Sequence, residues 1–317
     1  MRRRSLLAGT AAAGFARPAF ADTWPSRPIK LVAPFAPGGG SDFTSRLIAE
    51  KLSARLGQPV IVDNKPGAGG NLGAEVAIKA PPDGYTFLTI SGSYAINAIL
   101  HQPSFDSLND IVAIGQFTDE PTILCVSPSV PAKNLGELVT LCKRDPGKLA
   151  YGSSGPGGLA HLGTEFFLDA AGIKATHVPY RGSGLALNDL IAGNVQILDG
   201  GTTTMLPYIK SGQVRALAIT KRIAAAPDIA TYGEQGYPTL EFNLWHGMIG
   251  AKAIPPQIVT RLNAELNEVL KTPEVSGRLA EEGVITVGGT SDAFMEAIRT
   301  EEKRWREFIQ RTGLKLE

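Results

Sequence analysis

Residues 29–56 read IKLVAPFAPGGGSDFTSRLIAEKLSARL, which is a short apolar run, a glycine-rich loop and an amphipathic segment in direct succession. The apolar run 29–33 predicts a β-strand. The stretch 41–56 predicts a helix, because apolar residues recur there at the spacing of one helix face: Phe43, Leu47, Ile48, Leu52 and Leu56. A strand, a tight loop and a helix form the repeating unit of α/β folds.

The same alternation continues along the chain and predicts α/β lobes with mainly parallel sheets. Asn134 is expected to cap a helix, with Glu137 completing a capping box, and Ser291 to cap the last helix. Pro255 and Pro256 are expected to open another helix. The remaining expected strands are 59–63, 85–90, 122–127, 150–152, 176–179, 195–198, 215–220 and 245–251. The remaining expected helices are 73–80, one ending at Gly172, 183–193, and a short helix between 198 and 215.

The first 21 residues predict an export signal. Arg2, Arg3 and Arg4 precede a short apolar run, and Ala19-Phe20-Ala21 fits a cleavage site, so the mature chain is expected to start at Asp22 in the periplasm. Both the twin-arginine and the general secretory routes fit the two arginines. The remaining 296 residues suggest two lobes, since a domain usually has about 100–200 residues. Strands 122–127 and 245–251 are the expected crossings between them.

Composition excludes several classes of partner. Without the four arginines of the signal, 31 Lys and Arg become 27 against 30 Asp and Glu, a net charge of −3. Nucleic acid is therefore not an expected partner. No second stretch is apolar and long enough to span a bilayer. Cys125 and Cys142 are interpreted as two buried thiols, with a disulfide as the alternative that a periplasm would allow.

Three glycine-rich loops carry the predicted chemistry, and each lies between an expected strand and an expected helix. They are residues 35–42, 64–73 and 152–161. Glycine lets backbone amides approach a ligand closely, and a helix start adds unpaired N–H groups and a partial positive charge. Such loops predict an anion site that needs no arginine. Tight βα turns without a ligand are the alternative, and Asp42 is interpreted as a helix cap or first-turn residue.

Enzyme signatures are weak. Residues 155–160 match G-x-G-x-x-A of dinucleotide sites, but no acidic residue follows at the required distance. Gly152-Ser153-Ser154-Gly155 misses the G-x-S-x-G spacing of a nucleophile elbow by one residue. His161 has no further partners that would make a metal site, and His101, His177 and His246 are expected to be structural. We therefore expect no catalytic residues, no metal and no cofactor.

The loops and several further motifs resemble the Bug-type solute receptors of tripartite tricarboxylate transporters. The resemblance extends over the mature chain and rests on motifs in the same order, at 34–42, 64–70, 82–85, 151–155, 161–162, 178–182 and 211–218. It implies a two-lobed periplasmic-binding-protein fold of type II, with two crossing strands. Its lobes would be 22–124 with 242–317, and 125–241.

The resemblance also implies a small carboxylate held between the first and third loops, largely by backbone amides and water. The implied ligand-binding residues are Phe35, Pro37, Gly38, Gly39, Gly40, Ser41, Asp42, Ser91, Ser93, Ser153, Ser154, Gly155, Gly157, Gly158, His161, Arg181 and Asp199. One position departs from the family, because relatives carry an Asp-Asn pair where Asp199 is followed by Gly200.

The expected function is capture of a small carboxylate and its delivery to a membrane transporter. The expected partners are that ligand and, transiently, the integral membrane subunits, with the receptor itself a monomer. Two alternatives remain. One is a ligand-sensing input for a membrane kinase, and the other is a secreted hydrolase that uses Ser153 or Ser154 with His161.

Overall fold

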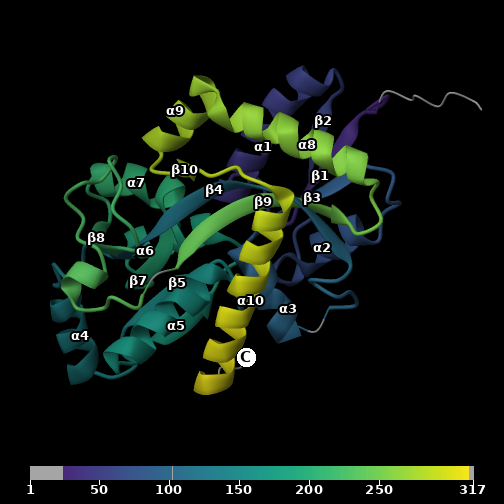
Figure 1. Ribbon diagram of the computed structural model, residues 1–317. Coiled ribbons are helices and arrows are strands. Elements are labelled where there is room, and N and C mark those ends of the chain that lie inside the picture. Colours follow the sequence, from purple (N-terminus) through teal and green to yellow (C-terminus); the bar gives the residue numbers. More distant parts are fainter. Residues whose placement is uncertain (1–23, 102, 241, 314–317) are drawn as a thin grey trace, which may run out of the picture.

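A computed structural model describes residues 24–101, 103–240 and 242–313 as a mixed α/β fold on one continuous sheet (Figure 1). The strands follow one another across the sheet as β2 (Val60–Asn64), β1 (Ile29–Ala33), β3 (Thr86–Ser91), β9 (Asn243–Ala251), β4 (Ile111–Val126), β7 (Ile197–Gly201), β5 (Ala150–Ser153) and β6 (Thr176–Pro179). Two more strands, β8 (Arg215–Ile219) and β10 (Ile285–Thr286), also pair with β4. The export signal predicted at 1–21 lies outside the described residues.

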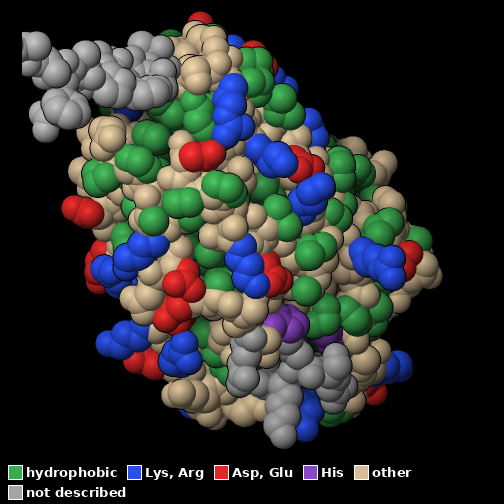
Figure 2. Space-filling view, turned by 90° about the vertical axis from the view of Figure 1, so that its right-hand side faces the viewer, with side chains coloured by type: hydrophobic (Ala, Val, Ile, Leu, Met, Phe, Trp, Pro, Cys, Tyr) green, Lys and Arg blue, Asp and Glu red, His purple; other side chains and the backbone are tan. Residues whose placement is uncertain are grey.

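Helices cover both halves of this sheet (Figure 1). They are α1 (Gly40–Leu56), α2 (Asn71–Ile78), α3 (Gly92–His101), α4 (Leu135–Arg144), α5 (Leu159–Ala171), α6 (Ser183–Ala192), α7 (Thr202–Lys210), α8 (Pro256–Lys271), α9 (Pro273–Glu281) and α10 (Ser291–Thr312), with short 3-10 turns at Ala68–Gly70 and Gly233–Gln235. Within the described part of the chain, no helix is both long and apolar enough to cross a membrane. On the face that Figure 2 shows, side chains of both charges lie interspersed with hydrophobic ones.

Strand β4 belongs to both halves of the sheet. It pairs with β9 from Ile111 to Pro121, and with β7 from Thr122 to Val126. These pairings are antiparallel, as are those of β4 with β8 and β10 and of β9 with β3. Only β2-β1-β3 and β7-β5-β6 are parallel. The prediction of mainly parallel sheets is therefore wrong, because the strands joining the halves run against their neighbours.

Two elements were missed or shortened by the sequence analysis. Strand β4 begins at Ile111, not at Thr122. Its first part was missed because Gly115, polar residues and Pro121 interrupt the apolar pattern, and its register with β9 shifts twice. Helix α3 begins at Gly92, directly after β3, where the sequence analysis expected no helix. By contrast, the expected strand 29–33 coincides with β1.

The helix caps follow the sequence signals with one exception. Asn134 accepts a hydrogen bond from the Glu137 N–H at 2.9 Å, as predicted. The Glu137 carboxylate accepts from the Lys133 N–H at 2.8 Å. The last helix is capped by Thr290, whose hydroxyl accepts from the Ala293 N–H at 3.1 Å. The predicted cap Ser291 is wrong, because its hydroxyl donates to a β4 carbonyl instead.

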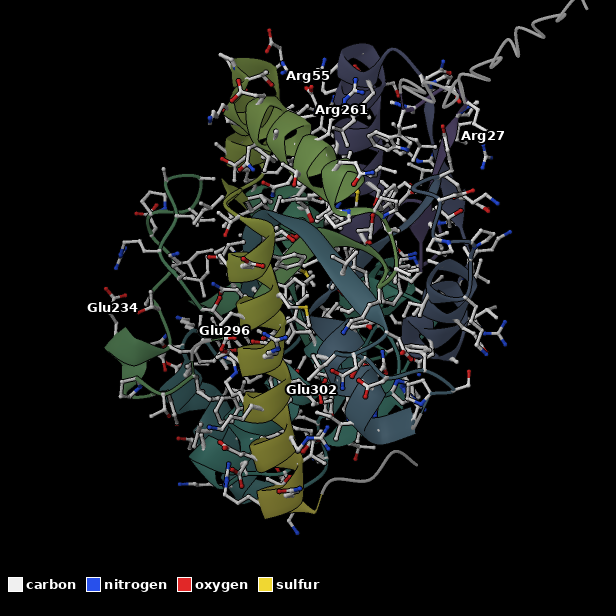
Figure 3. All side chains as sticks on the ribbon, turned by 45° about the vertical axis from the view of Figure 1, so that its right-hand side comes forward. Arg27, Arg55, Glu234, Arg261, Glu296 and Glu302 are labelled. Carbon is white, nitrogen blue, oxygen red and sulfur yellow. The ribbon has the colours of Figure 1, made fainter. Side chains whose placement is uncertain are left out.

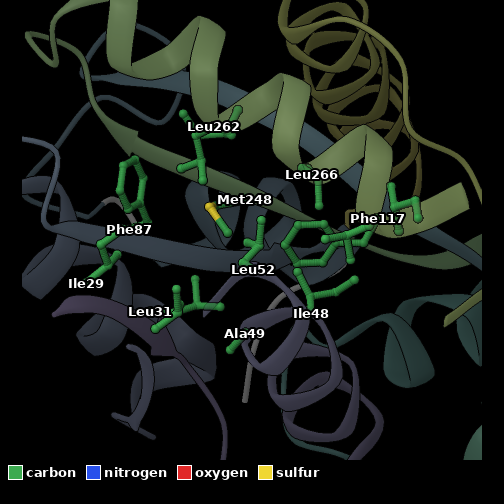
Figure 4. Packing of buried hydrophobic residues seen from close by; sticks show 14 of the residues in the cluster. Ile29, Leu31, Ile48, Ala49, Leu52, Phe87, Phe117, Met248, Leu262 and Leu266 are labelled. Atoms are coloured by element: carbon green, nitrogen blue, oxygen red, sulfur yellow. The ribbon is translucent and has the colours of Figure 1, made fainter. Parts of the chain in front are cut away.

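Apolar cores lie on each half of the sheet. Helix α8 starts after Pro255 as predicted and buries one face: Ile258, Leu262, Leu266 and Leu270. Figure 4 shows Leu262 and Leu266 above Met248 of β9 and Phe117 of β4.

Cys125 on β4 and Cys142 on α4 are both free and buried, in agreement with the favoured interpretation. The disulfide alternative is not formed.

The last helix, α10, packs against both halves. Figure 1 shows it (yellow) running from the crossing strands toward α3 and α5. Near its start, Phe294 meets Trp245 of β9 edge-on at a ring distance of 5.6 Å. Near its end, Trp305 and Phe308 join the core of the second half and contact Phe166 of α5. Between them, Glu302 (Figure 3) is buried and accepts from the Ser107 hydroxyl at 2.8 Å.

Truncating the anchor of α10 on the second half should destabilise the whole protein. Trp305 is 1% exposed, and removal of a large buried aromatic costs about 3–5 kcal/mol. Trp305→Ala should lower the free energy of unfolding by that amount in urea titrations. Lys303→Ala, an exposed control on the same helix, should change it by less than about 0.5 kcal/mol. Equal unfolding midpoints for the two variants would contradict this account of α10.

Candidate functional site

A cavity of about 340 Å³ lies where the two halves of the sheet meet. Loops at the ends of β1, β3, β5, β6 and β7 line it, together with the middle of β4 and the start of β9. Its size falls within the usual range for small-ligand sites. The residues that line it are Phe35–Ser41, Ser91, Ser93, Glu120, Thr122, Ser154, Leu159, Ala160, Arg181–Leu185, Asp199–Gly201, Thr203, Thr204, Leu244 and His246.

Five helices begin at this cavity. First-turn residues of α1, α3, α5, α6 and α7 all line it, and each helix has at least nine residues. The first N–H groups of a helix have no partner within the helix, and its start carries about half a positive charge. Where several starts meet, the amides form an anion site without a charged side chain. This geometry extends the prediction from the first and third loops to three more loops.

The first loop is held in shape by the side chain at the start of α1. The Asp42 carboxylate accepts from the Gly38 N–H at 3.1 Å and from the Asn64 amide at 2.9 Å, and it pairs with Arg46. Burial acts to raise the pKa of Asp42, but the hydrogen bonds from Arg46, Asn64 and Gly38 outweigh it and lower that pKa. Asp42 does not line the cavity, so its place is that of a first-turn residue that fixes the loop.

Two positions of the first loop require glycine, for different reasons. Gly38 has a φ of +91°, a conformation that side chains strongly disfavour. A Cβ at Gly40 would lie 2.9 Å from the Thr203 hydroxyl oxygen, so this glycine permits the close approach of α1 and α7. The second glycine-rich loop, 64–73, does not line the cavity, contrary to the prediction that all three loops contribute to the anion site. Its Gly73 packs against Pro34, and a Cβ there would lie 3.0 Å from the Pro34 Cα.

The third loop is shaped from behind by two histidines. The His161 Nδ1 accepts from the Gly157 N–H at 3.1 Å, and Ser153 pairs with His177 at 2.7 Å. The rings of His161 and His177 are stacked 3.9 Å apart. Burial, with a smaller effect of His177, lowers the pKa of His161 to about 3, and burial lowers that of His177 to about 4. Both rings are therefore neutral at pH 7, and each holds the loop in place through one hydrogen bond.

Of the predicted residues in this loop, only Ser154 lines the cavity. The others lie behind it: Ser153, Gly155, Gly157, Gly158 and His161. Ser153 is fully buried, and its hydrogen-bonding histidine is His177 and not His161. The other predicted residues line the cavity, with the exception of Asp42. They are the predicted residues of the first loop, Ser91, Ser93, Arg181 and Asp199.

Two buried carboxyl groups line the cavity, one from β4 and one from β7. Glu120 on β4 accepts from the Thr203 N–H at 2.9 Å and from the Thr203 hydroxyl at 2.7 Å, so the protein's own carboxyl occupies the start of α7. Burial raises the pKa of Glu120. Asp199 accepts from the Tyr232 hydroxyl at 3.2 Å. Burial raises the pKa of Asp199 to about 7, although the nearby Thr122 and Tyr232 hydroxyls act in the opposite direction.

Sequence reasoning missed several cavity residues. Glu120 and Thr122 lie on β4, and Leu244 and His246 on β9. His246, expected to be structural, has its Nδ1 3.3 Å from the Thr118 hydroxyl, and burial lowers its pKa to about 4. The sequence did contain a signal for these residues, because two strands were expected to cross between the lobes. A strand that crosses between two lobes must border the space between the lobes. Among the described residues, no group of His, Cys, Asp and Glu is placed to hold a metal ion.

Comparison with known proteins gives concordant results. The model of the tripartite tricarboxylate transporter family receptor matches residues 44–314. Protein BugT of Bordetella pertussis is 37% identical over 311 residues, which cover 96% of this chain and 95% of that protein.

Solved structures agree with this chain over most of its length. The periplasmic binding protein BugD superposes with a TM-score of 0.87 at 30% identity, covering 93% of this chain and all of that one. Rpa4515 of R. palustris, solved with adipate, has a TM-score of 0.87 at 32% identity and covers 92% of this chain and 98% of its own. The chain therefore belongs to the receptor family of the tripartite tricarboxylate transporters.

Proposed function

We propose that this protein captures a small carboxylate in the cavity and delivers it to the membrane subunits of a tripartite transporter. The observation that carries the proposal is the convergence of five helix starts on one cavity. Their amides provide hydrogen bonds and positive potential for a carboxylate. The adipate bound in the structure of Rpa4515 supports the same class of ligand.

The place of action follows from the same family. We propose that residues 1–21 direct export, that cleavage near Ala21-Asp22 releases the receptor into the periplasm, and that it works there as a monomer. Contact with the membrane subunits would be transient, as delivery requires release. Binding would occur without turnover. Ser153 supports this view, because it is fully buried and bonded to His177 behind the cavity wall.

The proposal is tested by a thermal-shift panel of small acids on the mature protein. The panel should span di- and tricarboxylates, amino acids and aromatic acids. A ligand at one hundred times its Kd stabilises the folded state by about 2.7 kcal/mol, so at least one acid should raise the Tm by several degrees. Lost uptake of that acid in a deletion strain would connect binding to transport. If no acid raises the Tm and none co-purifies with the protein, the proposal is wrong.

Backbone amides, more than Arg181, should hold the carboxylate. Gly39 lines the cavity with a φ of −89° that valine tolerates, and a Cβ there meets no atom within 4 Å. Gly39→Val should therefore place its methyl groups in the path of the ligand. The loss of a hydrogen bond to a charged group, about 1.5–3 kcal/mol, predicts at least tenfold weaker binding by calorimetry. Arg181→Ala should have a smaller effect, because Arg181 is exposed.

A matched control separates blocking from destabilisation. Gly277→Val makes the same change on exposed helix α9, also in open space, and should leave affinity unchanged. Gly157→Val is unsuitable, because Gly157 has a φ of +73° and does not line the cavity. If folded Gly39→Val binds like the wild type and Arg181→Ala does not bind, Arg181 and not the backbone amides holds the carboxylate.

Ligand should close the two lobes, which we propose to be 22–124 with 242–317, and 125–241. A bound carboxylate attracts helix starts from both halves, and exclusion of water strengthens those bonds. Small-angle scattering should show a smaller radius of gyration with saturating ligand. Because α10 is anchored on both halves, the open and closed forms should differ by a small rotation. Superimposable curves with and without a tight ligand would contradict closure.

A further inference from the structure

Asp199 lines the cavity and carries a buried oxygen that makes no hydrogen bond of standard geometry. The side chain is fully buried at the end of β7 and lines the cavity wall. Its Oδ2 accepts from the Tyr232 hydroxyl at 3.2 Å. Its Oδ1 has no hydrogen-bond partner among the described residues. A buried acceptor left unpaired is destabilising, so this oxygen marks a position where a bound molecule gains by donating a hydrogen bond.

Other unpartnered polar atoms line the same cavity. The Ser41 hydroxyl at the start of α1 and the Nε2 of His246 on β9 are buried without a partner in the described structure. The Thr122 hydroxyl makes no hydrogen bond of standard geometry either, but it lies near enough to Asp199 to lower the pKa of that carboxyl. These atoms belong to cavity-lining residues on different elements, which favours a ligand with more than one polar group.

The charges of the wall are unevenly distributed. Helix starts and Arg181 line parts of the cavity that suit a carboxylate. Asp199 and Glu120 are carboxyl groups on the adjoining strands, and of the two only Glu120 is hydrogen-bonded to a helix start. A ligand carboxylate placed beside Asp199 would meet an acceptor of like charge. An ammonium or hydroxyl group there would instead donate to the free oxygen.

We propose that the ligand carries a hydrogen-bond donor, an ammonium or a hydroxyl group, that meets the Oδ1 of Asp199. This inference rests on the proposed function, which supplies the carboxylate. It selects amino acids and hydroxy acids over plain acids of the same length. Asp199 is thus a specificity-determining residue, and the helix starts provide the general affinity for carboxylates.

The test uses acids of one chain length that differ only in the donor. Succinate, malate and aspartate form the four-carbon series, and glutarate, 2-hydroxyglutarate and glutamate form the five-carbon series. The acid panel selects the length. In calorimetry on the mature protein, malate or aspartate should bind at least tenfold more tightly than succinate. The better of the two identifies the donor.

Two variants assign the preference to Asp199. Asp199→Asn removes the charge but keeps an acceptor, so it should weaken aspartate binding at least tenfold and spare malate. Asp199→Ala removes both and should abolish either preference. Asp228→Asn, the same change on an exposed residue away from this cavity, should leave all affinities unchanged. Folding of each variant is checked by its unfolding midpoint.

The pH dependence gives an independent readout. Burial raises the pKa of Asp199 to about 7, and a bound ammonium favours the charged form. Aspartate affinity should therefore rise with pH up to about 7 and then level off, whereas succinate affinity should fall above that pH. Around Asp199, burial raises the pKa of Tyr232 and Cys125 and lowers that of His246 to about 4. Arg181 also lines the cavity.

Glu120 is the remaining acid of the cavity, and burial raises its pKa as well. The slope with pH should therefore disappear in Asp199→Asn if Asp199 causes it. The inference is overturned if succinate binds as tightly as malate and aspartate. It is also overturned if every acid that binds lacks a donor, or if both Asp199 variants keep the wild-type order. Failure of every acid to bind would instead refute the proposed function.

Discussion

The structure depends on the pairing of one long strand with both halves of the sheet. Strand β4 extends over Ile111–Val126 and changes partner from β9 to β7 between Pro121 and Thr122. Its hydrogen bonds therefore join the two halves into one sheet. The change of partner also brings Glu120 and Thr122 to the cavity. The place where the halves are joined is thus also the floor of the site.

The site itself is mainly a property of the backbone. Loops after β1, β3, β5, β6 and β7 all lead into helices that begin at the cavity. Side chains around it serve mostly to hold these loops, as Asp42 does for the first and His161 for the third. Such a site recognises a carboxylate by geometry and leaves discrimination among acids to the few side chains with free polar atoms.

Local signals made much of this predictable. The glycine-rich loops, the Asn134 cap and the buried face of α8 appear in the sequence as patterns between near neighbours. Pattern reading failed where long-range pairing decides the structure, as in the polar first part of β4. It also could not distinguish loop residues that face the cavity from those behind it. Ser153 and Ser154 are adjacent, yet only Ser154 lines the cavity.

Glu120 also determines how much charge the cavity can accept. Five helix starts reach the cavity, but the start of α7 already holds the Glu120 carboxyl through Thr203. The ligand therefore meets a positive potential reduced by an internal competitor. Part of the start of α7 is therefore engaged within the protein and is not offered to a ligand. A lineage with this scaffold could change from one class of acid to another by altering a single internal carboxyl, without rebuilding a loop.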